Sequence, residues 1–280
     1  GVIRAMSRLE DFMSTQPTVA VVHLQGGITM ARSPSSRARI APHEVIPTLR
    51  ALAEDPRVKS VVLAVESGGG SVLASDLIWR EVALLKEKKP VVAAFGDVAA
   101  SGGYYISAPA TAIVARPGTL TGSIGVVGGK LVTGGATRAL GIYAEELHRG
   151  RNVGMYGTEH GFDEHQRARF RQRLEDTYAS FIERVSSGRG RSTEQIDEVA
   201  RGRVWTGRSA LEAGLVDSLG GLREALRCAR QEAGLKPGDP WRRTDTVVRP
   251  RRSWLMEMLP QVQGLLPAAL TKLQLPPAWS

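Results

Sequence analysis

The sequence predicts an α/β fold in which parallel strands form a central sheet covered by helices. Three short runs are apolar, continuous and rich in β-branched residues, as the buried strands of parallel sheets tend to be: Thr18–Leu24, Ser60–Val65 and Pro90–Phe95. Amphipathic segments separate these runs, which gives repeated strand–helix–strand units. Such units require right-handed crossovers and a sheet covered on both faces. We therefore expect repeated βαβ units with the helices on the outside.

Amphipathic helices are expected between and after these strands. Helices over residues 43–56 and 71–89 separate the strands, and a longer helix is expected over residues 163–190. Apolar residues recur at helical spacing along one face of the last two segments, namely Val72, Leu73, Leu77, Ile78, Val82 and Leu85, and then Phe170, Leu174, Tyr178, Phe181, Ile182 and Val185. Ser192 or Thr193 begins a further helix with a capping box, and Gly214 ends the next one.

The composition is that of an ordinary globular protein with a basic surface. Of the 280 residues 42% are hydrophobic and 5% aromatic, and the formal net charge is +9. The arginines are scattered and no zinc-finger or RNA-binding motif accompanies them, so we expect no nucleic-acid partner. The single cysteine, Cys228, permits no internal disulfide and is expected to be a buried structural thiol. No cluster of His, Cys, Asp and Glu has metal-ligand spacing, so we expect no metal or cofactor.

The chain is expected to divide into three parts. Residues 1–17 are a lead-in or a linker between homologous halves, and the absence of an initiating Met suggests a piece of a longer protein. Residues 18–235 form the α/β domain. Residues 236–280 are an extended arginine- and proline-rich linker and an apolar tail that docks elsewhere or rests on a membrane surface. No run of about 18 apolar residues is present, so no segment is expected to span a membrane.

Two glycine clusters follow predicted strands, at the sheet edge where open α/β proteins bind ligands. One spans Glu66–Val72 and the other surrounds Ser101. Glycines let a ligand approach the backbone, and a helix N-terminus offers free N–H groups. The amides of Gly69, Gly70 and Gly102 could therefore form an oxyanion hole. The pattern leaves three roles open for Ser101: a nucleophile, a helix cap or part of a phosphate site, although no phosphate-binding motif matches.

A second serine, Ser123, lies in a third glycine-rich cluster downstream of Ser101. A serine nucleophile needs a base that takes its proton. In a Ser/Lys pair, a second hydroxyl helps to hold the neutral lysine in place. Burial must also lower the pKa of that lysine from about 10.4 toward neutrality.

Three stretches of the sequence resemble one family of enzymes. The chain is similar to the signal peptide peptidase A (protease IV) family of Ser/Lys serine peptidases, which have the Clp protease–crotonase fold, in SGGGSV (residues 67–72), GDVAASGGYYISAPATAIVARPGTLTGSIGVVG (residues 96–128) and RSTEQIDEVARGRVWTGRSALEAGLVDSLGG (residues 191–221). The resemblance extends from about Thr18 to Glu232, and the last two motifs are too long to arise readily by chance.

The resemblance implies a role for each site residue. It makes Ser101 the acyl-forming nucleophile, Ser123 the hydroxyl that positions the lysine, and Gly69 and Gly102 the oxyanion donors. It implies peptide substrates, namely cleaved signal peptides and other short or unfolded chains, which should lie extended along the strand edge near Glu66–Gly70. It also implies a homo-oligomer and a soluble domain peripheral to the bacterial inner (cytoplasmic) membrane.

The general base is missing from its expected position. Single-domain members of the family carry the lysine in a stretch that aligns with RGRNVGMYG, where this chain has Val153, and valine cannot accept a proton. Lys130 is the one internal candidate among the lysines of the chain, which are Lys59, Lys86, Lys88, Lys89, Lys130, Lys236 and Lys272. A Ser-His-Asp triad that uses His148, His160 or His165 stays open, since triads are recognised by geometry.

The larger family members offer an explanation for the missing lysine. They consist of two homologous halves, of which the N-terminal half carries the lysine and the C-terminal half the serine. This chain resembles the C-terminal half, so we expect a preceding half to supply the lysine and this chain alone to be inactive. Two alternatives stay open. One is an inactive homologue that acts as a scaffold or assembly subunit, and the other is an acyl-CoA enzyme of the crotonase type with a similar oxyanion hole.

Overall fold

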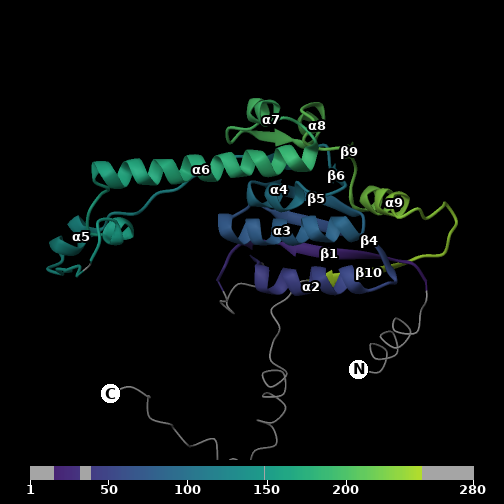
Figure 1. Ribbon diagram of the computed structural model, residues 1–280, viewed down its shortest axis with the longest axis horizontal. Coiled ribbons are helices and arrows are strands. Elements are labelled where there is room, and N and C mark those ends of the chain that lie inside the picture. The colour runs from purple at the N-terminus through teal and green to yellow at the C-terminus, as the bar shows by residue number, and fades with distance from the viewer. Residues whose placement is uncertain (1–15, 32–38, 148, 248–280) are drawn as a thin grey trace, which may run out of the picture. The chain divides into compact units, whose positions relative to one another are not determined.

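The computed structural model describes residues 16–31, 39–147 and 149–247 (Figure 1). The chain divides into two compact units, Gly1–Val248 and Arg249–Ser280. The second unit, and with it the expected apolar tail, lies outside the described residues, as does most of the expected lead-in over residues 1–17. Within the part of the chain that is described, no helix combines the length and the apolar character needed to cross a lipid bilayer.

Strands and helices alternate along the first unit. The strands are β1 (Thr18–Gln25), β2 (Gly27–Ile28), β3 (Arg39–Ile40), β4 (Val58–Ser67), β5 (Val91–Ala100), β6 (Ala112–Ala115), β7 (Leu120–Gly122), β8 (Val204–Thr206), β9 (Ser218–Leu219) and β10 (Arg242–Val247). The helices are α2 (Pro42–Glu54), α3 (Val72–Lys88), α4 (Gly102–Ser107), α5 (Gly134–Ala139), α6 (Glu164–Arg189), α7 (Thr193–Val199), α8 (Gly207–Glu212) and α9 (Leu222–Glu232), with the 3-10 turn η1 (Val153–Tyr156). The strands and helices that the sequence predicts are present. One of them, β5, continues past its predicted end at Phe95 to Ala100.

The main sheet is mostly parallel. Its strands follow the order β10-β1-β4-β5-β6-β9, and every neighbouring pair in this row is parallel. The short strand β7 pairs with the end of β5 in parallel and with β8 in antiparallel orientation. The α/β class and the parallel sheet are therefore confirmed. Because parallel strands end at the same edge, the segments that follow β4, β5 and β7 are brought together.

Both faces of the sheet are buried under helices. Successive side chains of a strand point to opposite faces, and in β1 the residues Val22 and Leu24 pack in one cluster with α2, α3 and α4. Val19 and Val21 belong to a second cluster that includes α9. In Figure 1, α2 lies beside α3 and α3 beside α4. The helices thus lie outside the sheet, as predicted.

One strand forms where the sequence predicts a linker. β10 lies parallel to β1, with Thr18 opposite Arg242, and His23 Nε2 lies 2.8 Å from Asp245 Oδ1. Charged residues in a strand are typical of a sheet edge, where one face and one side meet solvent. Because of these charged residues, β10 lacks the apolar run by which the buried strands were predicted. The α/β unit therefore continues through β10 rather than ending at the predicted boundary after residue 235.

The ends of the long helices follow local sequence signals. α6 begins at a capping box in which Asp163 accepts from the Gln166 amide, and it ends at Gly190, which has the left-handed conformation. α7 begins at the predicted capping box, with Ser192 as the cap and Gln195 as its partner. These two helices bring the downstream strand β8 back to β7, beside the segment that contains Ser123.

Candidate active site

Ser101 occupies a strained turn between β5 and α4. Its φ is 52° and its ψ is −119°, a conformation that L-residues rarely adopt and that costs about 1–3 kcal/mol. The residue lies at the N-cap position of α4, yet its side chain makes no capping hydrogen bond. Ser101 thus occupies the cap position of α4 without capping the helix through its side chain. Among the residues that the structure describes, the half-buried hydroxyl has no capping partner and is available for another role.

The short helix α4 anchors this turn in the core. All its residues, Gly102–Ser107, are buried. The Tyr104 hydroxyl donates to the Leu215 carbonyl oxygen at 2.8 Å, and burial raises the pKa of Tyr104 above its ordinary value. The Tyr104 ring also contacts Phe95 of β5 at 6.2 Å between centroids. This packing can hold Ser101 in a conformation that the residue would not adopt alone.

Gly69 packs directly against the Ser101 turn. Its φ is +98°, and a Cβ added there would lie 2.6 Å from the Gly102 nitrogen and 2.9 Å from the Ser101 Cβ. The Gly102 amide, at the start of α4, has no hydrogen-bond acceptor among the described residues. The Gly69 amide donates to Ser67 Oγ at 3.1 Å. The structure thus brings the two glycines beside Ser101, with the Gly102 N–H unengaged.

One side of the glycine turn is already paired. Ile28 donates to the Gly69 carbonyl oxygen at 2.9 Å and accepts from the Ser71 amide at 2.8 Å, and this forms an isolated parallel bridge with Gly70. A substrate cannot add as a strand at this side of Glu66–Gly70 without displacing Ile28. Ile28 therefore occupies this side of the turn, and the placement of an extended peptide near Glu66–Gly70 stays a prediction.

Ser123 follows the strand that adjoins the Ser101 turn. β5 and β7 are in register from Val98 opposite Leu120 to Ala100 opposite Gly122. The Ser101 amide donates to the Gly122 carbonyl oxygen at 2.9 Å. The two serines therefore emerge next to each other from the ends of paired strands. Ser123 is also strained, with a φ of 50°.

A network on α6 and α7 holds the turn against which Ser123 packs. The Ser123 amide donates to the Arg203 carbonyl oxygen at 2.7 Å. Arg201, two residues before Arg203, has a φ of 57°. Its amide donates to the Tyr178 hydroxyl, and that hydroxyl donates to Asp197 at 2.5 Å. Hydrogen bonds from Arg201 and Tyr178 lower the pKa of Asp197. The sequence reading missed this network, because α6 and α7 meet only in the folded chain.

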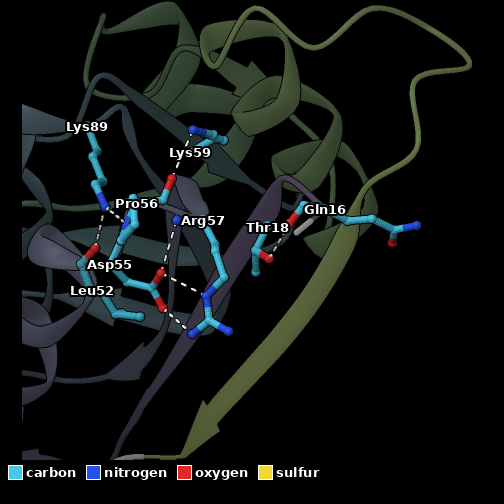
Figure 2. A network of polar contacts seen from close by, with 8 residues as sticks. All are labelled: Gln16, Thr18, Leu52, Asp55, Pro56, Arg57, Lys59 and Lys89. Carbon is cyan, nitrogen blue, oxygen red and sulfur yellow. Dashed lines mark hydrogen bonds and ion pairs between the residues drawn. The ribbon is translucent and has the colours of Figure 1, made fainter. Parts of the chain in front are cut away.

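Most described lysines lie at the opposite edge of the sheet. Figure 2 shows Lys59 and Lys89 at the beginnings of β4 and β5, whereas Ser101 follows the end of β5. Lys89 Nζ donates to the carbonyl oxygens of Leu52, at 2.7 Å, and of Asp55, which caps the end of α2. Burial lowers the pKa of Lys89. Lys89 therefore lies at the opposite edge of the sheet from Ser101.

The remaining candidate bases lie between Ser123 and the first part of α6. Lys130 Nζ donates to the Met155 carbonyl oxygen at 2.9 Å and lies 4.6 Å from the Phe162 ring centroid, so its ammonium is already engaged. Val153, in η1, has an exposed fraction of 62%. His160 precedes α6 and His165 lies in its first turn, at the end nearer α5 in Figure 1, while His148 is not described.

A groove of about 760 Å³ lies between α6 and the segments that follow the glycine turn, Ser101 and Ser123. Its walls include Val72 and Leu73 after the glycine turn, Tyr105 after Ser101, and Val127 after Ser123, and α6 supplies many of the others. Leu73 and Val127 are 59% and 97% exposed. Neither serine lines the groove itself, but the segments that follow them contribute exposed apolar side chains to it.

A serine on a sharp strand-to-helix turn, beside a free amide at the helix N-terminus, is the arrangement that serine hydrolases use on α/β sheets. Comparison with known proteins agrees with this class. Residues 83–236 match the model of Peptidase family S49. The chain belongs to this family, and its mostly parallel sheet with outer helices agrees with the Clp protease-like fold expected from the resemblance.

Named relatives match most of this chain. The chloroplastic serine protease SPPA of Arabidopsis thaliana is 37% identical over 220 residues, which cover 78% of this chain and 32% of the relative. Protease 4 of Salmonella typhi is 36% identical over 264 residues, covering 91% and 42% of the two chains. Protease 4 of Haemophilus influenzae is 35% identical over 227 residues, covering 80% and 36%. The chain thus spans about a third to two fifths of the length of these relatives.

Proposed function

We propose that this chain is the serine-bearing part of a serine endopeptidase in which Ser101 is the nucleophile. The observation that carries the proposal is the strained Ser101 turn, whose uncapped hydroxyl stands beside the free Gly102 amide. A residue held in a rare conformation by a buried helix is typical of a functional site. Membership of a peptidase family supports the reaction class.

The proposed reaction is acyl transfer to Ser101 followed by hydrolysis. The Ser101 oxygen attacks the scissile carbonyl carbon, while a neutral lysine takes the hydroxyl proton and then gives it to the leaving amine. The Gly102 N–H donates to the developing oxyanion, and the Gly69 N–H joins it by leaving Ser67 Oγ. Water then attacks the ester carbonyl carbon while the lysine takes a proton from it, and the lysine returns this proton to the Ser101 oxygen as the acyl–oxygen bond breaks and the carboxylic acid product leaves. Ser123 keeps the lysine amine in place.

The lysine comes, in this proposal, from a homologous half that precedes this chain. Three observations support a base from outside: valine stands at position 153, Lys130 is bonded to Met155, and Lys59 and Lys89 lie at the far edge of the sheet. The three relatives named above are about two to three times as long as the matched region, which leaves room for a second half in them.

The proposed substrates are extended apolar peptides, such as cleaved signal peptides. The groove lined by segments that follow the glycine turn and the two serines has exposed apolar side chains at Leu73 and Val127, and side chains of small or aliphatic type would fit there. We further propose that the assembled protein is a homo-oligomer that works at the surface of a bacterial inner membrane. Its basic net charge of +9 would favour an anionic lipid surface.

Cleavage of an apolar peptide by the full-length protein tests the proposal. Ser101→Ala should abolish cleavage, and Ser123→Ala should lower kcat by at least about 100-fold, since the lysine amine is then unsupported. Ser187→Ala, which changes an exposed serine of α6 outside the groove, should change neither. Cleavage that persists in Ser101→Ala would refute the proposal. A folded protein that never cleaves would instead favour the alternative, an inactive scaffold or assembly subunit.

A further inference from the structure

The strand that leads to Ser101 contains two extra residues just before the site. β4 and β5 pair in steady register from Val61 opposite Val91 to Val65 opposite Phe95. The next pair is Ser67 opposite Ala99, so that Glu66 faces the three residues Gly96, Asp97 and Val98 of β5. A bulge of this kind bends a strand and leaves backbone amides without ladder partners.

The side chain of Glu66 satisfies the amides of this bulge. One carboxylate oxygen accepts from the Asp97 amide at 2.7 Å and the other from the Val98 amide at 3.1 Å. Hydrogen bonds from N–H groups to a charged carboxylate are stronger than those between neutral groups. Gly96 leaves the space for this carboxylate, because a Cβ there would lie 1.8 Å from Glu66 Oε2. Glu66 and Gly96 therefore form a matched pair.

The bulge is also the place where β5 changes its neighbour. Before it, β5 pairs with β6, and after it β5 pairs with β7, which leads to Ser123. Two threonines hold the opposite side: Thr119 Oγ1 donates to the Gly96 carbonyl oxygen at 2.6 Å, and Thr121 Oγ1 donates to the Ala99 carbonyl oxygen at 2.7 Å. On the β4 side, the Glu66 carboxylate is the side chain that bonds the bulge amides.

We propose that Glu66 is a positioning residue that sets the place of Ser101 relative to Gly69. Glu66 lies on the strand that continues into the Gly69 turn, and its two hydrogen bonds fix the strand segment that continues into Ser101. It touches no reacting atom. It fixes the register of β5 against β4 where the two strands lead into Ser101 and the glycine turn. This register determines how closely the Ser101 oxygen approaches the oxyanion donors. This inference rests on the proposed role of Ser101 as the nucleophile.

The carboxylate is needed because two amides point at two oxygens. Glutamine keeps the length of the side chain but offers one oxygen and an NH₂ group, so one bulge amide would face a donor. The geometry of the bulge would relax by a fraction of an ångström to an ångström. Misplacement on that scale slows reactions by up to about 100-fold.

The test compares acylation of Ser101 in variants of the full-length protein. We would measure the rate constant for reaction with a fluorophosphonate probe, counted per reactive site, for the wild type, Glu66→Gln and Gly96→Ala. Gly96→Ala keeps the Glu66 carboxylate, but the added methyl group displaces it. Both variants should react at least about 10-fold more slowly, while the fraction of sites that finally react stays near one. A merely structural loss would lower that fraction and leave the rate constant unchanged.

Glu54→Gln is the matched control. It removes one exposed carboxylate, which is paired with Lys88 at the far edge of the sheet, and should leave the rate constant within about twofold. If Glu66→Gln and Gly96→Ala both react within twofold of the wild type, Glu66 is not a positioning residue, whereas the role of Ser101 stands. If the wild type is not labelled at Ser101, the proposed function fails and this inference fails with it.

Discussion

The Ser101 amide donates to the Gly122 carbonyl oxygen at 2.9 Å, and this bond joins the two serine-bearing turns of the site. It extends the β5–β7 ladder by one residue beyond Ala100 opposite Gly122. Both serines have positive φ, so each turn is held in its conformation by its surroundings rather than by its own preference. The site is therefore sensitive to changes in the backbone around it.

A methyl group at Gly69 should destroy the site. Gly69→Ala places a Cβ 2.6 Å from the Gly102 nitrogen in a residue with a φ of +98°, so the turn must move away from Ser101. We expect the acylation rate of the full-length protein to fall by about 100-fold or more. Gly68→Ala is the control, because a Cβ there meets nothing within 4 Å. Equal rates for the two variants would contradict the described geometry.

Relief of strain at Ser101 should stabilise the fold. Ser101→Ala and Ser101→Gly both remove the hydroxyl, but glycine adopts a φ of 52° at little steric cost. We expect the glycine variant to have a free energy of unfolding about 1 kcal/mol higher than the alanine variant. Urea unfolding followed by circular dichroism measures this difference. A glycine variant less stable than the alanine variant would show that the Ser101 turn is not strained.

The hydroxyl of Tyr178 should stabilise the turn at Arg201. Tyr178→Phe removes the hydrogen bond to Asp197 and leaves the Arg201 amide without its acceptor. We expect a loss of about 1 kcal/mol in the free energy of unfolding, and faster hydrogen exchange in residues 201–203. Tyr143→Phe, which changes an exposed tyrosine, should alter neither quantity. Unchanged exchange in the Tyr178 variant would mean that the network does not hold the turn.

The Asp55–Arg57 pair should make part of the stability depend on pH. Hydrogen bonds from Arg57, opposed by partial burial, hold the pKa of Asp55 below its ordinary value of 3.8 (Figure 2). A carboxyl group with a lowered pKa in the folded state contributes stability above its unfolded pKa, and loses it as the pH falls through the folded value.

The variant Asp55→Asn tests this pH dependence. It should lower the urea midpoint at pH 6 and leave a smaller difference from the wild type near pH 3, which is below the ordinary pKa of 3.8, so that Asp55 of the unfolded wild-type chain already binds a proton. The measurement is urea unfolding at both pH values. A deficit that stays constant between pH 6 and pH 3 would show that ionisation of Asp55 does not contribute.

The sequence predicted the elements with strong local signals. Apolar β-branched runs gave β1, β4 and β5, helical periodicity gave α3 and α6, and the Ser192 capping box gave α7. The strand β10 was missed because a strand at a sheet edge carries charged residues, and its pairing with β1 joins parts of the chain that are far apart in sequence.

The site could be predicted in outline but not in its contacts. Glycine clusters after strands pointed to Gly69, Ser101 and Ser123, and the structure brings all three together. The engagement of the Gly69 amide by Ser67, and the bridge from Ile28, depend on backbone orientation, which residue identities do not encode. The hydrogen bonds of Glu66 depend on a shift in register between β4 and β5, which cannot be predicted from the local sequence.

Acylation of this chain with and without the proposed preceding half tests the central claim most directly. A fluorophosphonate probe would be added to the 280-residue chain alone and to the full-length protein, and the labelled residue would be identified by mass spectrometry. We predict rapid labelling at Ser101 in the full-length protein, almost none in the chain alone, and none in Ser101→Ala. Equal labelling of the chain alone would show that the base lies within it, and labelling at another serine would contradict the assignment of Ser101.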